Sequence, residues 1–279
     1  MGGAEAYDID ALQVDPQAVL DGCGERVACD RCGKKVRFFC YVCCVPVGQL
    51  AGKIPQLRLP FKMDILKHSG ELDGKSTAVH AKIIAPDDTR LMTYGPDSLA
   101  DVDLDRTLLL FPGPDALDIA QVDQETFDRV VVIDGTWRQA KGMAREDARL
   151  RKMRKVTVHP RQTRFWRYQS LDDSFMATIE AIYFLYRDSV ARGGAYAGEY
   201  DGLMFFYKYF YQFIQGEYAA QPEKRFTWRQ RERYIDYERA PRKEAGGGQR
   251  KDRRDTSAKV DYEFADDLAL DAVFDEGAE

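Results

Sequence analysis

Several features that define common protein classes are missing from this chain of 279 residues. It contains no run of about 18 apolar residues, the minimum for a membrane-spanning helix, and no secretory signal pattern opens it. Glycine-rich loops of the Gly-x-Gly-x-x-Gly or Walker type are also absent. The three histidines are scattered and show no ligand spacing. We therefore expect an intracellular protein, nuclear, cytoplasmic or both, with no membrane contact and no standard Rossmann or P-loop site.

An overall basic excess is missing too, although the distribution of charge changes what this means. The formal net charge is −5, which by itself argues against a nucleic-acid partner. Residues 1–21 hold five acids and no base, and residues 255–279 hold nine acids and one base. Residues 221–254, in contrast, hold twelve bases and six acids. The acidity belongs to the two ends, and a nucleic-acid partner remains open.

All six cysteines lie between residues 23 and 44, which is too concentrated for an ordinary core distribution. Two Cys-x2-Cys pairs, separated by seven residues with a Gly33-Lys-Lys35 turn, let four thiolates converge on one Zn²⁺. Such a closed site stabilises a fold and does not catalyse. Cys44 is an alternative to Cys43, and free thiols are the alternative to metal. The spacing predicts a structural zinc site formed by Cys29, Cys32, Cys40 and Cys43.

The remaining pattern predicts an α/β domain. Residues 107–111 and 129–133 are short continuous apolar runs, typical of parallel strands covered on both faces. Residues 77–85 alternate apolar and polar side chains, which indicates another strand, and residues 156–158 are a further candidate. Helices are expected over 137–150, 174–192 and 203–215. This alternation favours a parallel sheet with helices on both faces.

Ligands of parallel α/β sheets bind at loops beyond the carboxyl ends of the strands. Two loops qualify here, Leu110–Pro114 and Asp134–Trp137. Asp134 has the chemistry of a base or of a ligand for an ammonium group. The alternative is that Asp134 only caps the helix that begins near Trp137.

The second of these loops carries a family resemblance. Val131-Val-Ile followed by Asp134-Gly-Thr-Trp137 resembles the Asp-x-Thr-Trp signature of the DTW-domain family of tRNA-uridine aminocarboxypropyltransferases. The resemblance covers about residues 25–216 and is nearest to a eukaryotic branch. One departure is Met176-Ala-Thr178, where Leu-Ser-Thr is more usual. Further segments agree in order: the paired cysteines, 74–82, 111–114, 163–167 and 175–182.

The resemblance implies a fold and a reaction. Family members resemble the SPOUT class, α/β enzymes whose largely parallel sheet contains a trefoil knot. They transfer the 3-amino-3-carboxypropyl group of S-adenosylmethionine to N3 of a uridine in the tRNA D-loop, releasing 5′-methylthioadenosine. We therefore expect tRNA as partner and no obligate protein partner. Two other classes stay open, an S-adenosylmethionine-dependent RNA methyltransferase of the same fold and a non-catalytic zinc-containing RNA-binding protein.

Roles for individual residues follow from the resemblance together with their chemistry. Asp134 would act as base or orient N3–H, Thr136 would hold Asp134 or the uracil edge, and Trp137 would stack on a ring or pack the helix. Glu180 would bind the ammonium group of the cofactor. The expected cofactor-binding residues are Phe111, Pro112, Gly113, Phe175, Thr178 and Glu180.

RNA contacts are expected within residues 145–167, which hold nine bases and two acids and end in aromatic side chains. Bases supply phosphate contacts and flat rings stack on unpaired nucleobases. A solvated helix face is the alternative. The expected RNA-binding residues are Arg161, Arg164, Trp166 and Arg167.

These assignments divide the chain into five parts. The segment 241–256 is Gly-rich and charged, has no apolar period and is typical of a flexible linker. We expect an acidic N-terminal extension over 1–21, a zinc-binding module over 22–50, the DTW catalytic domain over 51–220, a basic aromatic extension over 221–240, and a flexible linker with an acidic tail over 241–279.

Overall fold

The computed structural model describes residues 5–166, 175–191 and 196–220. These residues divide into two compact units. The larger unit contains residues 5–163, 175–191 and 196–209, and the smaller contains residues 164–166 and 210–220. The expected basic extension, linker and acidic tail lie outside the described residues. Within the described ranges, no helix combines the length and apolar composition needed to cross a membrane.

A six-stranded sheet forms the centre of the larger unit, and all of its strand pairs are parallel. The expected strands at 107–111 and 129–133 are confirmed as β8 and β10. They are neighbours in the sheet, so their carboxyl ends meet at one edge. The candidate at 156–158 overlaps β11, and three further strands, β6, β7 and β9, were not expected from the sequence. The strand order is β7 (Thr89–Thr93), β6 (Lys62–Lys67), β10 (Arg129–Asp134), β8 (Thr107–Leu110), β11 (Arg154–Thr157) and β9 (Leu117–Asp118).

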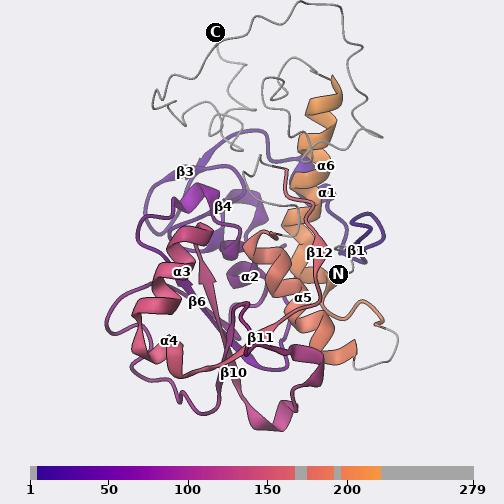
Figure 1. Cartoon of the computed structure of the whole chain (residues 1–279). Helices are drawn as coiled ribbons and strands as arrows, with labels where there is room; N and C mark the ends of the chain where they lie inside the picture. The colour runs from indigo at the N-terminus through magenta and orange to yellow at the C-terminus, as the bar shows by residue number, and fades with distance from the viewer. Residues whose placement is uncertain (1–4, 167–174, 192–195, 221–279) are drawn as a thin grey trace, which may run out of the picture. The chain divides into compact units, whose positions relative to one another are not determined.

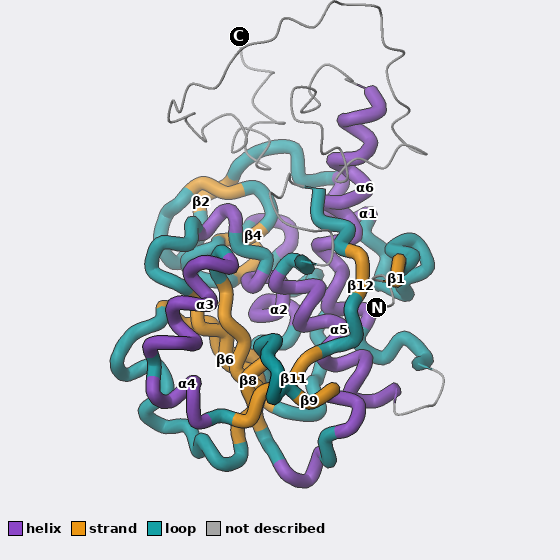
Figure 2. The backbone as a smooth tube through the Cα atoms, in the orientation of Figure 1, coloured by secondary structure: helices purple, strands orange, loops and turns teal. Residues whose placement is uncertain are grey.

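Helices flank this sheet, as Figures 1 and 2 show. Side chains alternate along a strand, so each strand presents every second residue to one face. Val131 and Leu109 pack with Met143 of α3 (Trp137–Glu146) and Leu150 of α4 (Ala148–Lys152). On the opposite face, α5 (Thr178–Ala191) lies against β10. The other helices are α1 (Ala18–Asp21), α2 (Ala78–Ile84) and α6 (Phe205–Ala220).

Short elements complete the described part. The strand β1 (Glu5–Ala6) pairs in parallel with β12 (Arg161–Gln162). Two small antiparallel hairpins carry the cysteines, β2 (Val27–Ala28) with β3 (Lys35–Val36) and β4 (Phe39–Cys40) with β5 (Val45–Pro46). The 3-10 turns are η1 (Gly48–Leu50), η2 (Asp73–Lys75), η3 (Ile119–Gln121), η4 (Gln124–Thr126) and η5 (Asp201–Met204).

The prediction of a strand over residues 77–85 is wrong, because residues 78–84 of this segment form the helix α2. Six of its seven residues are buried, so no polar face marks a helical period. The alternation of small apolar and polar residues therefore imitates a strand. The helix expected over 137–150 is interrupted at Asp147, whose carboxylate accepts a hydrogen bond from the backbone N–H of Arg149 and starts α4.

Candidate cofactor cavity and four-cysteine site

A cavity of about 490 Å³ opens beyond the carboxyl ends of β8 and β10, the edge at which parallel α/β sheets bind ligands. Its volume lies within the usual range for small-molecule sites, and its lining is mostly apolar with few polar groups. Residues that line it include Leu110, Phe111, Pro112, Ile133, Gly135, Trp137, Lys141, Thr157, Pro160, Phe175, Met176 and Thr178.

Three aromatic rings form one wall of this cavity. The Trp137 ring lies 5.0 Å from that of Phe175 in an edge-on arrangement and 5.8 Å from that of Phe111. Each ring comes from a different segment: the loop after β8, the start of α3, and the residues before α5. Trp137 therefore packs within the protein and also presents a surface to a ligand, so both roles expected for it have a structural basis.

Asp134, at the end of β10, is buried with 2% of its surface exposed, and it does not line the cavity. Its carboxylate accepts two hydrogen bonds, from the Ser76 hydroxyl at 2.7 Å and from the Thr178 hydroxyl at 2.6 Å. Thr178 lines the cavity, so it stands between the carboxylate and any ligand. Sequence reasoning gave Ser76 no role, although it lies in one of the segments that resemble the family.

Burial determines the electrostatics of this carboxylate. Desolvation raises the pKa of Asp134 above its ordinary value, while the Thr178 and Ser76 hydroxyls and the nearby Lys67 ammonium oppose that rise. Because Thr178 donates its proton to Asp134, the lone pairs of its oxygen remain available on the cavity side. The arrangement can accept a hydrogen bond or a proton from a ligand through Thr178.

Thr136 has a different position from the one expected. It caps α3 in a capping box, in which its hydroxyl accepts from the Gln139 N–H and the Gln139 side chain accepts from the Thr136 N–H. Its exposed side chain does not hold Asp134, whose partners are Ser76 and Thr178. The alternative that Asp134 caps this helix is also wrong, because Thr136 is the cap.

Glu180 does not lie where a cofactor-binding residue should. It is fully buried and outside the cavity lining. Its carboxylate accepts hydrogen bonds from the Tyr7 hydroxyl, the Thr163 hydroxyl and the Ala177 N–H, at 2.6, 2.5 and 2.7 Å. Because protein donors already occupy this carboxylate, the geometry does not favour the expected contact with a cofactor ammonium, and that contact stays a prediction. Gly113 is also absent from the lining, whereas its neighbours Phe111 and Pro112 belong to it.

Two of the expected RNA-binding side chains are buried. Arg161 is 8% exposed, forms a two-bond ion pair with Asp188 at 2.6 and 2.8 Å, and lies over the Phe184 ring. Trp166 is 3% exposed and packs against Phe210. Both side chains thus pack in the protein interior, so the geometry does not favour their expected contacts with RNA, which stay predictions. Arg164 is half-buried, and Arg167 lies outside the described residues.

The four cysteines of the two Cys-x2-Cys pairs do come together. Their sulfur atoms all lie within 4.8 Å of one another. A tetrahedral Zn²⁺ with bonds of about 2.3 Å requires sulfur atoms about 3.8 Å apart, so the cluster could hold a metal ion. Backbone N–H groups of Arg31 and Cys32 lower the pKa of Cys29 to about 7, which favours a thiolate.

The other two cysteines do not belong to this cluster. Cys44 has a positive φ of 51° that turns its thiol toward the Tyr41 carbonyl, so Cys44 does not replace Cys43. The Cys23 sulfur accepts a hydrogen bond from the Gln49 amide at 3.4 Å. The expected ligand set of Cys29, Cys32, Cys40 and Cys43 is therefore the one that the hairpins bring together.

The parallel α/β sheet has an apolar cavity at the carboxyl ends of its strands, and a cluster of four thiols accompanies it. These features define the class as an α/β protein with a small-molecule cavity. The family model of the DTW domain matches residues 37–215, and the chain belongs to the DTW-domain family. No solved structure matches the chain.

Curated relatives of this family share one name, tRNA-uridine aminocarboxypropyltransferase 1. The relative from Mus musculus is 37% identical over 236 residues, which are 68% of this chain and 77% of the relative. The one from Xenopus laevis is 32% identical over 251 residues, 73% of this chain and 86% of the relative. The one from Homo sapiens is 33% identical over 237 residues, 68% of this chain and 77% of the relative.

Proposed function

We propose that this protein is a tRNA-uridine aminocarboxypropyltransferase. It transfers the 3-amino-3-carboxypropyl group of S-adenosylmethionine to N3 of a uridine in the tRNA D-loop, and 5′-methylthioadenosine leaves. The observation that carries the proposal is the similarity, over about 70% of the chain, to relatives that bear this name. We further propose a SPOUT-like fold with a trefoil knot, the five-part domain division given above, and a nuclear or cytoplasmic location, or both.

The cavity fits S-adenosylmethionine in size and chemistry. Its aromatic wall suits an adenine ring, and the few polar groups of its lining suit the amino acid part. When bound, the cosubstrate supplies an alkyl carbon activated by a sulfonium, a good leaving group. Phe111, Pro112, Trp137, Phe175 and Thr178 would hold it and exclude water.

Asp134 and Thr178 are proposed to handle the uridine proton together. N3–H of uridine is only weakly acidic, so attack on carbon requires its removal. Thr178 would accept this proton at its oxygen while its own proton passes to the Asp134 carboxylate. Ser76 would stabilise the carboxylate through the hydrogen bond it already makes. Burial, which raises the pKa of Asp134, makes this carboxylate a better proton acceptor than an exposed aspartate.

The decisive experiment identifies the product. The protein is incubated with labelled S-adenosylmethionine and unmodified tRNA, and the nucleosides are analysed by mass spectrometry. We expect a uridine that has gained the aminocarboxypropyl group, together with 5′-methylthioadenosine. A uridine that has gained only a methyl group would indicate an RNA methyltransferase. Tight tRNA binding without any modified nucleoside would indicate a non-catalytic RNA-binding protein.

The metal in the cysteine cluster is proposed to be structural zinc. Cys29→Ser and chelation should each lower the melting temperature and release about one zinc ion per chain. Cys23→Ser is the matched control, because the Cys23 thiol lies outside the cluster, and it should retain the metal. A protein that contains no zinc and melts unchanged after chelation would contradict this assignment.

A further inference from the structure

The outer face of α3 and α4 carries bases that no acidic side chain in the described part of the chain neutralises. Arg138 and Lys141 are exposed, and no acidic side chain of the described residues pairs with them. Lys152, at the end of α4, is in the same situation. Other bases of this stretch form ion pairs within the protein, such as Arg149, whose guanidinium pairs with Asp147.

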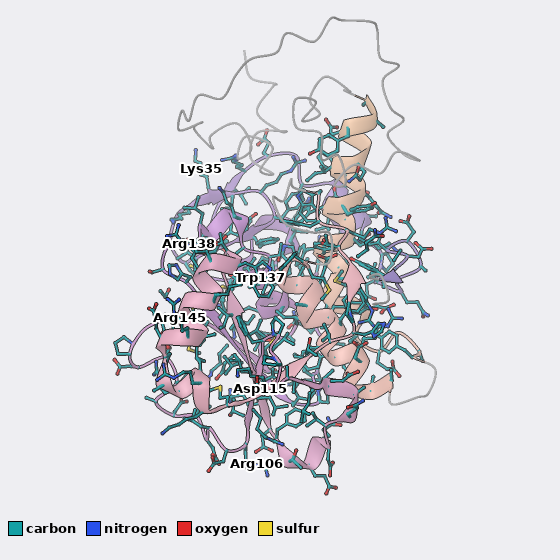
Figure 3. All side chains as sticks on the ribbon, in the orientation of Figure 1. Lys35, Arg106, Asp115, Trp137, Arg138 and Arg145 are labelled. Carbon is teal, nitrogen blue, oxygen red and sulfur yellow. The ribbon has the colours of Figure 1, made fainter. Side chains whose placement is uncertain are left out.

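Helical periodicity places the bases of α3 on one side. Arg138, Lys141 and Arg145 follow one another at spacings of three and four, so they share a face over about 10 Å of helix axis. Figure 3 shows Arg138 and Arg145 near the two ends of this helix. The opposite side of α3 is buried through Ala140 and Met143. The helix therefore separates an apolar inner face from a basic outer face.

The ion pair of Arg145 does not remove it from this face. Arg145 pairs with the adjacent Glu146 at 2.7 Å, but the two side chains are 78% and 69% exposed. Exposed pairs of this kind are screened by solvent and contribute little, so a phosphate can readily replace the carboxylate. Arg151 adds a further positive group near the end of α3, where it donates to the carbonyls of Arg145 and Glu146.

This basic face adjoins the cavity. Lys141 belongs to both, because its side chain lines the cavity while α3 carries it next to Arg138. The helix starts directly after Asp134 and Gly135, so its first turns lie beside the proposed proton acceptor. A nucleic acid bound along α3 would thus have its backbone neutralised next to the site where a base must enter.

We propose that the outer face of α3 and α4, represented by Arg138, Lys141, Arg145 and Lys152, binds the phosphate backbone of the tRNA substrate. The inference rests on the proposed function. It moves the RNA surface away from Arg161 and Trp166, which the structure buries. Free arginine and lysine side chains along a helix match a polyanion, whose binding depends on neutralised phosphates and not on one base sequence.

The test compares the full-length protein with the double variant Arg138→Glu/Arg145→Glu. Neither residue lines the cavity, so S-adenosylmethionine binding reports an intact fold. We expect tRNA affinity to fall at least about tenfold, and the slope of log affinity against log salt to decrease by about 2. The matched control is Arg106→Glu, an exposed base directly before β8 at the amino end of the sheet, which Figure 3 shows well away from Arg138 and whose exposed pair with Asp128 contributes little.

The outcomes separate this surface from the proposed function. If the double variant binds tRNA as tightly as the wild type, or if Arg106→Glu weakens binding equally, the surface is wrong even when the wild type modifies tRNA. An acidic protein as the true partner of this face would produce the first of these results. If the wild type binds tRNA through this face but forms no modified uridine, the surface stands and the proposed function fails.

Discussion

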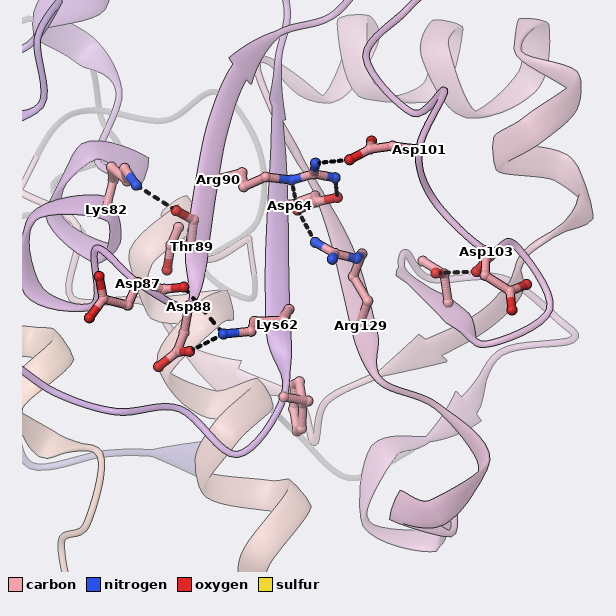
Figure 4. Close-up of polar contacts among 12 residues, drawn as sticks. Lys62, Asp64, Lys82, Asp87, Asp88, Thr89, Arg90, Asp101, Asp103 and Arg129 are labelled. Carbon is pink, nitrogen blue, oxygen red and sulfur yellow. Dashed lines mark hydrogen bonds and ion pairs between the residues drawn. The ribbon is translucent and has the colours of Figure 1, made fainter.

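Two buried aspartates on neighbouring strands show how differently one residue type is used. Asp64 on β6 is fully buried, and its carboxylate pairs with Arg90, whose Nε lies 2.7 Å away, and with Arg129 (Figure 4). Asp134 on β10 is equally buried, but only the hydroxyls of Ser76 and Thr178 donate to it. One carboxylate pairs with two guanidinium groups, whereas the other accepts hydrogen bonds from neutral hydroxyls, with the Lys67 ammonium nearby.

The difference separates a structural acid from a reactive one. Two guanidinium groups pair with the Asp64 carboxylate, and loss of its charge would leave them without this ionic partner. Asp134 has no opposite charge in hydrogen-bonding contact, so its protonation can change at moderate cost. One of its two donors also faces the cavity. Four experiments test this contrast, in order of decreasing expected effect.

The largest effect is expected for Asp134→Asn. The amide keeps the size and one acceptor oxygen but cannot take a proton, so turnover should fall by about 10²- to 10⁴-fold. Stability should stay the same or increase, because a buried charge without an ionic partner is removed. Single-turnover kinetics and a thermal melt measure the two quantities. Retained turnover would remove Asp134 from the mechanism.

The same substitution at Asp64 should affect stability, unlike Asp134→Asn, which should affect turnover. Asp64→Asn leaves two guanidinium groups facing a neutral amide and should lower the free energy of unfolding by about 3 kcal/mol. We expect the lower end of the usual range because the Arg90 side chain is 36% exposed. Urea unfolding measures the loss, with Arg106→Gln as control at an exposed pair that should cost below about 1 kcal/mol. Equal losses in both variants would refute the contrast.

A smaller effect is expected from the hydroxyls that hold Asp134. Thr178→Val removes a hydrogen bond to a charged group and should slow turnover by about 10- to 100-fold, whereas Thr178→Ser should restore most of it. Ser76→Ala should slow turnover less, because Ser76 does not line the cavity. Thr178→Val and Ser76→Ala should each shift the pH profile of turnover toward higher pH, since each removes a donor that lowers the pKa of Asp134. Equal rates for Thr178→Val and wild type would contradict the relay.

The smallest effect is a pH dependence of stability with opposite signs at two carboxyls. The pKa of Asp134 is raised, so wild-type stability from this group declines as pH rises above 3.8 through the raised value. Asp134→Asn should therefore gain stability relative to wild type as pH increases. Arg149 lowers the pKa of Asp147 to about 2, so the contribution of Asp147 is lost as pH falls from 3.8 toward 2. Melting temperatures of wild type and of the Asp134→Asn variant, measured from pH 2 to neutral pH, test both of these pH dependences.

Local patterns were sufficient for the strands that bear the cavity. The apolar runs that became β8 and β10 have both faces covered, so their composition alone reveals them. The strand β6 was not predicted because Asp64 interrupts its apolar run, and only its partners Arg90 and Arg129 explain a buried acid there. α2 was mistaken for a strand because a helix buried on nearly all sides has no polar face.

The sequence by itself determined the elements whose signal is local. These are the buried strands, the spacing of the two cysteine pairs, and the Asp134-to-Trp137 motif that places the chain in its family. Only the tertiary structure decided the partners of the reactive groups. Ser76 and Thr178 reach Asp134 from 58 and 44 residues away, and Arg161 is buried by Asp188 from another element. The reason is physical: periodicity reports which face of an element is apolar, whereas burial and charge pairing depend on which distant surfaces meet.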